Sequence, residues 1–423
     1  LDDANDFIEP TLRDHLPNPS SLQDMDIAAE RLANAIMKDE LIGIFGDYDV
    51  DGATSSSLLA RMFKSVGGRS TTYIPDRIKE GYGPNASALL GMLKSGVSVL
   101  VTVDCGTLSH EPLQIAKDAG LEVIVVDHHA AEANLPVATA IVNPNRLDDE
   151  SGQGHLAAVG VAFLLVVAVN RVLRNIGWYK THEEPDLTQW LDIVALGTVC
   201  DVVPLKGANR AFVRQGLKVM AKRRNLGLNA LADVAGLDEK PETFHLGFLM
   251  GPRVNAGGRI GLSELGTKLL ATEDLAEAME IAHRLDGFNS ERKEVEGQVL
   301  AQAINALEIE NADRATAFVA GKDWHPGVIG IVASRLKNRY NRPACVLSID
   351  GGRAVGSGRS VIGVDLGAAV IAARQLGIIE KGGGHQMAAG FTVPVKNLII
   401  FRDFLDERIG KHISDAGILP TIK

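Results

Sequence analysis

Four short runs rich in β-branched residues, between positions 41 and 143, constrain the fold more than any other feature. They are LIGIFG (41–46), TTYIP (71–75), VSVLVTVD (97–104) and LEVIVVD (121–127). The stretches between them, 55–65, 86–94 and 111–117, carry apolar residues at helical spacing, and each ends near a glycine. This alternation predicts an α/β fold with a parallel sheet, whose strands end at one common edge.

The rest of the chain predicts a helical region and then a second, smaller α/β domain. A length of 423 residues suggests two or three domains of about 150 residues each. The apolar run Leu156–Val169 is shorter than the roughly 20 residues of a membrane span, so we expect a buried helix. Further helices are expected over 188–198 and 210–221, and alternation of strands and helices resumes at Thr316. We therefore divide the chain into a first domain, 1–263, with an N-terminal extension, 1–40, a helical connector, 264–314, and a second domain, 315–423.

Composition limits the possible partners and compartments only weakly. Lys and Arg number 43 against 53 Asp and Glu, and the resulting net charge of −10 argues mildly against nucleic acid as a partner. A carboxylate-rich metal site would account for some of this charge, and a local basic groove can coexist with it. Three dispersed cysteines without a CxxC pair, and no visible signal peptide, predict a protein of the reducing cytoplasm.

Three aspartates, Asp47, Asp49 and Asp51, follow the first predicted strand in the segment GDYDVDG. Carboxylates this close repel one another unless a cation lies among them. A solvated turn is one alternative and a calcium loop is another. The calcium loop is disfavoured because Ser57 stands where its glutamate would be.

Other acidic and imidazole groups end later elements of the same domain. Asp104 ends one predicted strand, Asp127, His128 and His129 end the next, and Asp201 follows an apolar segment. Ligands gather at the carboxyl ends of parallel strands, so we expect these groups to converge. Oxygen ligands with one or two imidazoles suit Mn²⁺ or Mg²⁺, and there are enough for two ions. Two such ions are a recurrent arrangement for cleaving phosphoesters, because they activate water and clamp phosphoryl oxygens.

These residues carry a family resemblance. DYDVDG (47–52), VDCG (103–106), DHH (127–129) and CDVVPL (200–205) resemble the four motifs of the DHH phosphoesterase superfamily, and KGGGHQMAAG (381–390) resembles the signature of its companion DHHA1 domain. Within the superfamily, IPDRIKEGYG (74–83), GPRVNAGGR (251–259), LDGFNSERK and WHPGVIGIVASR (324–335) are most similar to the RecJ family of single-strand-specific 5′-to-3′ DNA exonucleases.

The resemblance implies a role for each motif residue. Two ions, Mn²⁺ or Mg²⁺, would be held by Asp49, Asp51, Asp104, His128 and Asp201, with Asp104 bridging. Asp47, Asp127 and His129 would have catalytic roles, orienting ligands or contacting the scissile phosphate. The substrate-binding candidates are Arg77, Tyr82, Arg253, Asn255, Arg259, Ser357, Arg359 and His385. For each of the first-domain arginines, an ordinary surface or ion-pair role is the alternative. The segment GSGRS (356–360) is expected to form a nest of backbone N–H groups for a phosphate, or otherwise a hairpin turn.

The activity implied by the resemblance is metal-dependent, 5′-to-3′ degradation of single-stranded DNA to 5′-mononucleotides in repair and recombination. The alternatives are a phosphodiesterase for oligoribonucleotides or cyclic dinucleotides, and an inactive single-strand-binding scaffold. Single-strand-binding protein and a RecQ-type helicase are expected partners. The family commonly continues into an OB-like domain, so the chain is expected to be a catalytic core.

Overall fold

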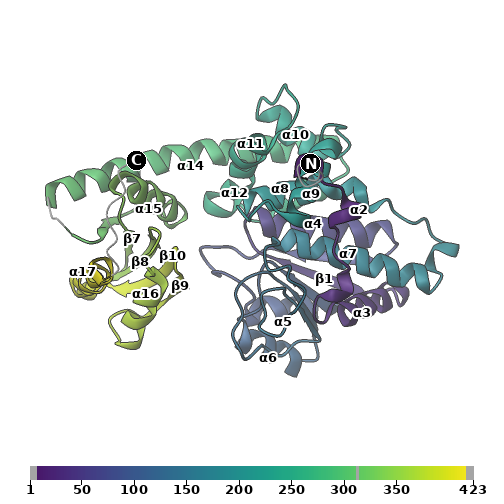
Figure 1. Cartoon of the computed structure of the whole chain (residues 1–423), viewed down its shortest axis with the longest axis horizontal. Helices are drawn as coiled ribbons and strands as arrows, with labels where there is room; N and C mark the ends of the chain where they lie inside the picture. Colours follow the sequence, from purple (N-terminus) through teal and green to yellow (C-terminus); the bar gives the residue numbers. More distant parts are fainter. Residues whose placement is uncertain (1–6, 311–313, 416–423) are drawn as a thin grey trace. The chain divides into compact units, whose positions relative to one another are not determined.

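The computed structural model describes residues 7–310 and 314–415, which form two compact units divided after Asn289 (Figure 1). The first unit contains a sheet with strand order β2-β1-β3-β4-β5, in which every neighbouring pair is parallel. Its strands are β1 (Leu41–Gly46), β2 (Arg69–Tyr73), β3 (Val97–Val103), β4 (Glu122–Val126) and β5 (Ala140–Val142). The predicted parallel sheet is confirmed, and β5, too short to give an apolar pattern, extends it.

Helices cover both faces of this sheet. On one face, Ile42 and Ile44 of β1 pack in a core with helices α3 (Met25–Met37), α4 (Val50–Ser65), α7 (Ala158–Asn175), α8 (Leu191–Cys200) and α9 (Gly207–Met220). On the other face, Phe45 packs with α5 (Ala86–Lys94) and α6 (His110–Asp118). The strands are therefore buried on both sides, which explains why their sequences are almost continuously apolar.

Helix α7 contains the long apolar run. Among the described residues, α7 is the one helix that is long and apolar enough to span a membrane. However, 72% of its 18 residues are buried inside the protein. An apolar helix that lies mostly inside the protein is a core helix. The prediction of a buried helix is confirmed.

The strand order creates a switch point at one edge of the sheet. The chain passes from β1 to β2 on one side and then crosses to β3 on the other, so the winding direction changes between β1 and β3. At such a switch point the loops after the two strands part, and ligands bind between them. Helix α4 begins at Val50, earlier than the predicted 55, and this brings Asp51 into its first turn.

The first unit contains further helices. They are α2 (Leu12–His15), α10 (Leu226–Val234), α11 (Thr243–His245), the π-helical turn η4 (Leu246–Met250), α12 (Gly251–Ile260) and α13 (Leu265–Ala271). Helix α14 (Leu275–Glu310) follows and crosses the division between the units. Helices α13 and α14 make up most of the described part of the helical stretch predicted over 264–314, and positions 311–313 of that stretch lie outside the described residues. Its role as a connector remains a prediction.

The second unit contains a mixed sheet with strand order β6-β7-β8-β10-β9, in which β6 and β7 are parallel and the other pairs antiparallel. Its elements are β6 (Ala317–Lys322), α15 (Pro326–Tyr340), β7 (Ala344–Asp350), β8 (Arg353–Arg359), α16 (Leu366–Gln375), β9 (Lys381–His385), β10 (Ala388–Pro394) and α17 (Leu398–Asp415). The second α/β fold predicted from Thr316 onward is confirmed.

Close packing of α8 against α9 at Gly216 gives a test of the first unit. A Cβ at Gly216 would lie 2.2 Å from the Leu191 carbonyl oxygen and 2.5 Å from Ala195 Cβ. Backbone cannot yield cheaply, so we expect Gly216→Ala to destabilise the unit by about 1–3 kcal/mol and to lower the calorimetric unfolding midpoint. In Gly91→Ala, within α5, the added methyl meets no described atom within 4 Å, and the midpoint should hold or rise. Equal midpoints for the two variants would contradict this packing.

Candidate metal centre and substrate-binding surface

Two of the aspartates after β1 are held by helix N-termini. Asp49 is the N-cap of α4, and its Oδ1 accepts hydrogen bonds from the N–H groups of Asp51 (2.9 Å) and Gly52 (3.2 Å). The Asp51 carboxylate accepts the N–H groups of Ala158 (2.7 Å) and Val159 (2.9 Å) at the start of α7. Helix N-termini attract negative charge, so the two carboxylates are fixed in place at the switch point.

Asp104 follows β3 and lies at the same switch point. It is buried and its backbone is left-handed, with φ of 61°. Among residues with a side chain, Asp and Asn adopt this conformation most readily. The residue therefore combines an acidic side chain with a sharp turn at the switch point.

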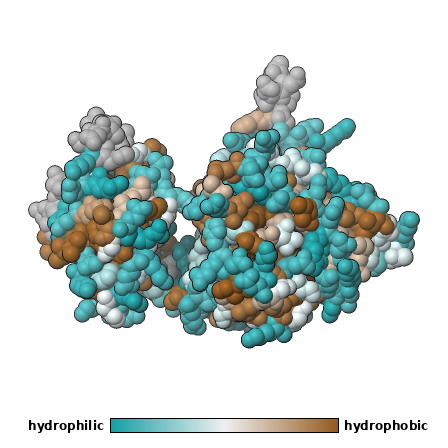
Figure 2. All heavy atoms as spheres, turned by 90° about the horizontal axis from the view of Figure 1, so that it is seen from below, coloured by the Kyte–Doolittle hydropathy of each residue, from teal (hydrophilic) through white to brown (hydrophobic). Residues whose placement is uncertain are grey.

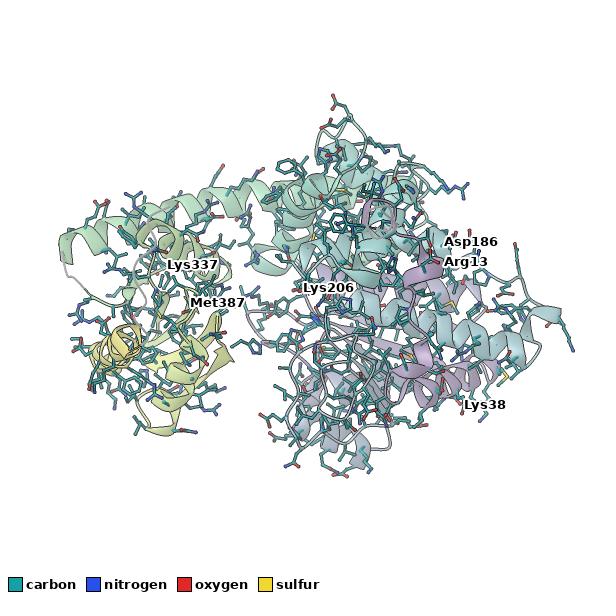
Figure 3. The ribbon with its side chains drawn as sticks, in the orientation of Figure 1. Arg13, Lys38, Asp186, Lys206, Lys337 and Met387 are labelled. Atoms are coloured by element: carbon teal, nitrogen blue, oxygen red, sulfur yellow. The ribbon has the colours of Figure 1, made fainter. Side chains whose placement is uncertain are left out.

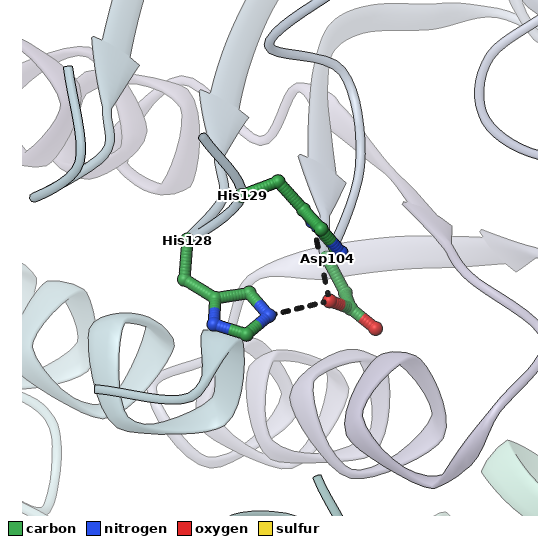
Figure 4. A group of neighbouring side chains, drawn as sticks. All are labelled: Asp104, His128 and His129. Carbon is green, nitrogen blue, oxygen red and sulfur yellow. Dashed lines mark ion pairs between the residues drawn. The ribbon is translucent and has the colours of Figure 1, made fainter. Parts of the chain in front are cut away.

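His128 presents a neutral ring nitrogen to three carboxylates. Its Nδ1 lies 3.0 Å from the Leu156 carbonyl oxygen, so Nδ1–H donates there and Nε2 keeps its lone pair. Nε2 lies 3.3 Å from Asp104 Oδ1 (Figure 4), 3.6 Å from Asp201 Oδ2 and 3.8 Å from Asp51 Oδ2. Burial, and then the charge of His129, lower the pKa of His128. A neutral imidazole of this tautomer is the form that binds metals.

The acidic groups strongly disfavour one another's ionisation. Burial raises the pKa of Asp51 and of Asp104 well above the usual range, and neighbouring carboxylates raise it further. Burial and the charge of Asp49 raise the pKa of Asp201 to about 7. Divalent cations would reverse these effects by supplying the missing positive charge.

The donor atoms fit divalent ions. Three groups offer ligand atoms that all lie within 4.8 Å of one another: Asp47, Asp49 and Asp104; Asp51, His128 and Asp201; and Asp104, His128 and His129. In the part of the chain that the structure describes, Asp47 Oδ1, His128 Nε2 and Asp201 Oδ2 are buried without a hydrogen-bond partner. Carboxylate oxygens with imidazole nitrogen suit Mn²⁺ or Mg²⁺. Asp47, predicted to orient rather than bind, lies among the possible ligands.

His129 is held differently from His128. Its Nδ1 lies 2.7 Å from Asp127 Oδ1. Burial opposes the charged form, but this hydrogen bond and the charge of Asp127 raise the pKa of His129 to about 9. Tyr82 lies beside this pair, with its hydroxyl 3.1 Å from the Asp104 carbonyl oxygen and 3.2 Å from His129 Nδ1. The predicted residues Tyr82, Asp127 and His129 therefore meet at the metal centre.

The structure adds two asparagines that sequence analysis missed. The side-chain N–H groups of buried Asn143 donate to the His129 carbonyl oxygen (2.9 Å) and to Thr107 Oγ1 (2.9 Å). Asn145 donates to the His128 carbonyl oxygen (2.6 Å), and its backbone N–H donates to Asn143 Oδ1 (2.8 Å). The signal was the segment NPN directly after a short apolar run, where β5 ends.

The predicted arginines of the first unit have different surroundings. The Arg77 guanidinium lies 4.8 Å from the centre of the Tyr48 ring, and the charge of Arg259 also acts on Tyr48. Arg253 instead donates to Asp286 (2.9 Å) and to the Leu249 carbonyl oxygen (2.7 Å), which is the ion-pair alternative. Asn255 lies half-buried on α12.

The other predicted substrate residues belong to the second unit, where one part of the prediction is wrong. Residues 356–359 lie within β8 and pair with β7 on one side and β10 on the other. Their backbone N–H groups therefore belong to the sheet and do not form a phosphate nest. The Arg359 side chain donates to Ser357 Oγ (3.0 Å) and to the Gly358 carbonyl oxygen (2.8 Å).

Two glycines, Gly383 and Gly390, lie on the sheet surface beside Ser357 and Arg359. Arg359 lies opposite Ala388, which lies opposite His385, and Ser357, Gly390 and Gly383 form the adjacent row across β8, β10 and β9. Directly opposite residues share a face of the sheet. A Cβ at Gly383 or Gly390 would meet none of the described atoms within 4 Å. This face thus has an open floor bordered by Ser357, Arg359 and His385; Met387 lies at the nearby turn between β9 and β10 (Figure 3).

Comparisons with known proteins identify the family. Residues 41–198 match the DHH family, N-terminal domain, and residues 292–411 match the DHHA1 domain. The single-stranded-DNA-specific exonuclease RecJ of Escherichia coli is 37% identical over 422 residues, which covers 95% of this chain and 73% of that protein. The chain belongs to the RecJ family.

Two further RecJ proteins show how far the similarity extends. RecJ of Bacillus subtilis is 38% identical over 409 residues, which covers 96% of this chain and 50% of that protein. The chain thus spans about half the length of that relative. A solved structure of exonuclease RecJ bound to manganese matches with a TM-score of 0.78 and 30% identity, covering 92% of this chain and 95% of that one. The family predicted from the motifs is confirmed, whereas the roles of single residues remain predictions.

The pairing of His129 with Asp127 predicts a measurable titration. In the metal-free protein, Asp127→Asn should lower the pKa of His129 by about 1 to 3, because the amide carries no charge. Two-dimensional NMR of the imidazole Cε1–H group would follow it. In the unaltered protein the folded pKa of His129, about 9, exceeds the ordinary 6.5. The raised pKa of His129 therefore stabilises the fold fully below pH 6.5, and this effect is lost as the pH rises through 9.

The control for this titration is Asp118→Asn, which changes an exposed carboxylate that accepts a hydrogen bond from Gln114. The control should leave the His129 titration unchanged. If Asp127→Asn also leaves it unchanged, Asp127 does not hold the proton on His129.

Proposed function

We propose that this chain is the nuclease core of a RecJ exonuclease, a metal-dependent hydrolase that degrades single-stranded DNA from its 5′ end to 5′-mononucleotides in repair and recombination. The observation that carries this proposal is the set of buried, unpartnered ligand atoms at the switch point between β1 and β3. Membership of the RecJ family supports the choice of substrate. By the same resemblance, we propose single-strand-binding protein and a RecQ-type helicase as partners, and the cytoplasm as location.

Five side chains would hold two ions, Mn²⁺ or Mg²⁺: Asp49, Asp51, Asp104, His128 and Asp201. Asp104 and His128 each belong to two of the three groups of ligand atoms. Asp104 is the shared ligand in this proposal because a carboxylate has two oxygens, whereas the free imidazole nitrogen has one lone pair. Bound divalent ions lower the pKa of water and neutralise charge on phosphoryl oxygens. The position of Asp47 Oδ1 makes it a sixth candidate.

The chain's own residues would handle a proton beside these ligands. His129 keeps its second proton at neutral pH because Asp127 pairs with it. A protonated imidazole can donate to a phosphate oxygen or to a departing 3′ oxygen. Asp127 would orient the ring, and Tyr82 would support Asp104 through its backbone carbonyl.

Donor side chains would bind the DNA strand, and glycines would let its sugar–phosphate backbone come close to the protein. In the second unit, Gly383 and Gly390 leave room for a sugar–phosphate backbone, and Arg359, Ser357 and His385 supply donors at its border. In the first unit, Arg77 and Arg259 would contact phosphates. For Arg253 we propose the ion-pair role instead, and its ion pair with Asp286 (2.9 Å) supports this.

A Mn²⁺ assay on single-stranded DNA oligonucleotides labelled at one or the other end tests the activity. We expect early release of a labelled mononucleotide from the 5′ end only, with duplex DNA spared. Cleavage confined to a short oligoribonucleotide or a cyclic dinucleotide would instead assign a phosphodiesterase. Tight strand binding without turnover would assign a scaffold.

Asp104→Asn tests the shared ligand. Asparagine tolerates the left-handed backbone at this position, so the fold should persist. We expect cleavage to fall by at least about a hundredfold, because changes to partners one contact further from a metal already cost 10- to 100-fold. Asp118→Asn is the matched control with full activity. Retention of more than about a tenth of the activity by Asp104→Asn would rule out the shared-ligand role.

A further inference from the structure

Two phenylalanines of the first unit are exposed where most aromatic side chains are buried. Across the described residues, the exposed Phe, Tyr and Trp side chains are Phe7, Tyr82, Phe244 and Phe248. The Phe7 ring is covered by the Arg210 guanidinium, which lies 3.5 Å from the ring centre. The Tyr82 hydroxyl donates a hydrogen bond to the Asp104 carbonyl oxygen beside the metal centre. Phe244 and Phe248 are 58% and 70% exposed and stack on each other, with ring centroids 5.1 Å apart and planes 25° apart.

The segment that carries these rings is anchored by its opposite side. Leu246 and Met250 are fully buried in the core of the first unit, and His245 is buried as well. The neighbouring positions Glu242 and Thr243 are exposed and polar. Burial of a phenyl ring would stabilise the fold, so two rings held in solvent by a well-anchored segment call for another role.

This segment packs on the helix that ends at the metal centre. The Leu246 carbonyl oxygen accepts a hydrogen bond from Cys200 Sγ (3.4 Å). At Gly251, an added Cβ would lie 2.4 Å from the same sulfur. Cys200 is the last residue of α8, and its successor Asp201 is the C-cap and a candidate metal ligand. The aromatic pair is thus carried by the element that contacts the last turn of α8.

We propose that Phe244 and Phe248 form a stacking platform for nucleobases of the single strand that is bound at the metal centre. The inference rests on the proposed function and adds to it a subsite for the bases. Every base has a flat aromatic face, so stacking on a ring strengthens binding without a sequence requirement, by roughly tenfold or more for one base. In duplex DNA both faces of each base are already stacked, so the platform would favour single strands.

The size of the pair favours bases over a protein partner. A stable protein interface buries about 800 Å² on each side, far more than two rings provide. Exposed polar residues adjoin the pair in the sequence. Figure 2 shows hydrophobic and hydrophilic side chains mixed over one face of the protein. Continuity with the metal centre through α8 points to the same substrate rather than to a separate ligand.

Fluorescence and kinetics of three variants test the proposal. The double variants Phe244→Ala/Phe248→Ala and Phe244→Leu/Phe248→Leu remove the rings, the second while keeping apolar side chains. Phe7→Ala is the matched control, since it removes an exposed ring elsewhere in the same unit. Each is measured with strands of about 20 nucleotides that carry 2-aminopurine at successive positions, because stacking quenches this base. Binding is measured in the Asp104→Asn background and cleavage in the unaltered background.

We expect both double variants to lose about tenfold or more in KM and in strand affinity, together with the quenching at one position, and the control to lose neither. The kcat of both double variants on the strand should stay unchanged. Their kcat/KM on the nitrophenyl ester of thymidine 5′-phosphate should also stay unchanged, because this small substrate carries a single base and has no other base to stack on the platform. Unchanged affinity and quenching, or leucine variants that bind like the unaltered protein, would overturn the platform. Absence of cleavage by the unaltered protein would refute the proposed function, while the quenching experiment would still decide the platform.

Discussion

Repulsion between buried carboxylates is the constraint on which the first unit depends. Asp49, Asp51 and Asp104 lie together at the switch point of a parallel sheet, and burial there raises the pKa of Asp51 and of Asp104. The N-termini of α4 and α7 reduce the free-energy cost of this repulsion, because their N–H groups donate hydrogen bonds to Asp49 and Asp51. The remaining negative charge is what divalent cations would neutralise, so the same arrangement that strains the metal-free protein selects for metal.

The adjacent histidines His128 and His129 have different charge states, neutral and protonated, because their hydrogen-bond partners differ. A backbone carbonyl accepts the proton of His128 and leaves its other nitrogen free, whereas the Asp127 carboxylate keeps His129 protonated. Asn143 and Asn145 hold the carbonyl groups of the two residues. One pair of neighbours can therefore provide a metal ligand and a proton donor side by side.

Much of this architecture was predictable, because periodic apolar runs and polar strand ends are local features. The parallel sheet, the buried helix α7 and the meeting of Asp49, Asp104 and His128 followed from them. Strand β5 did not, because three apolar residues carry no periodicity. The predicted nest at GSGRS failed because glycines suit both a turn and a crowded strand, and the choice depended on β7 and β10 on either side.

The sequence by itself determined the fold class, the family and the residue types of the centre, since each is encoded within a few consecutive positions. Only the tertiary structure decided the contacts between distant positions: Asp51 with the start of α7, Arg253 with Asp286, and the segment of Phe244 with the end of α8. An exposed ring and a buried ring look alike in a sequence. The difference between them is set by what packs on the opposite side of the segment, and that is a property of the folded chain alone.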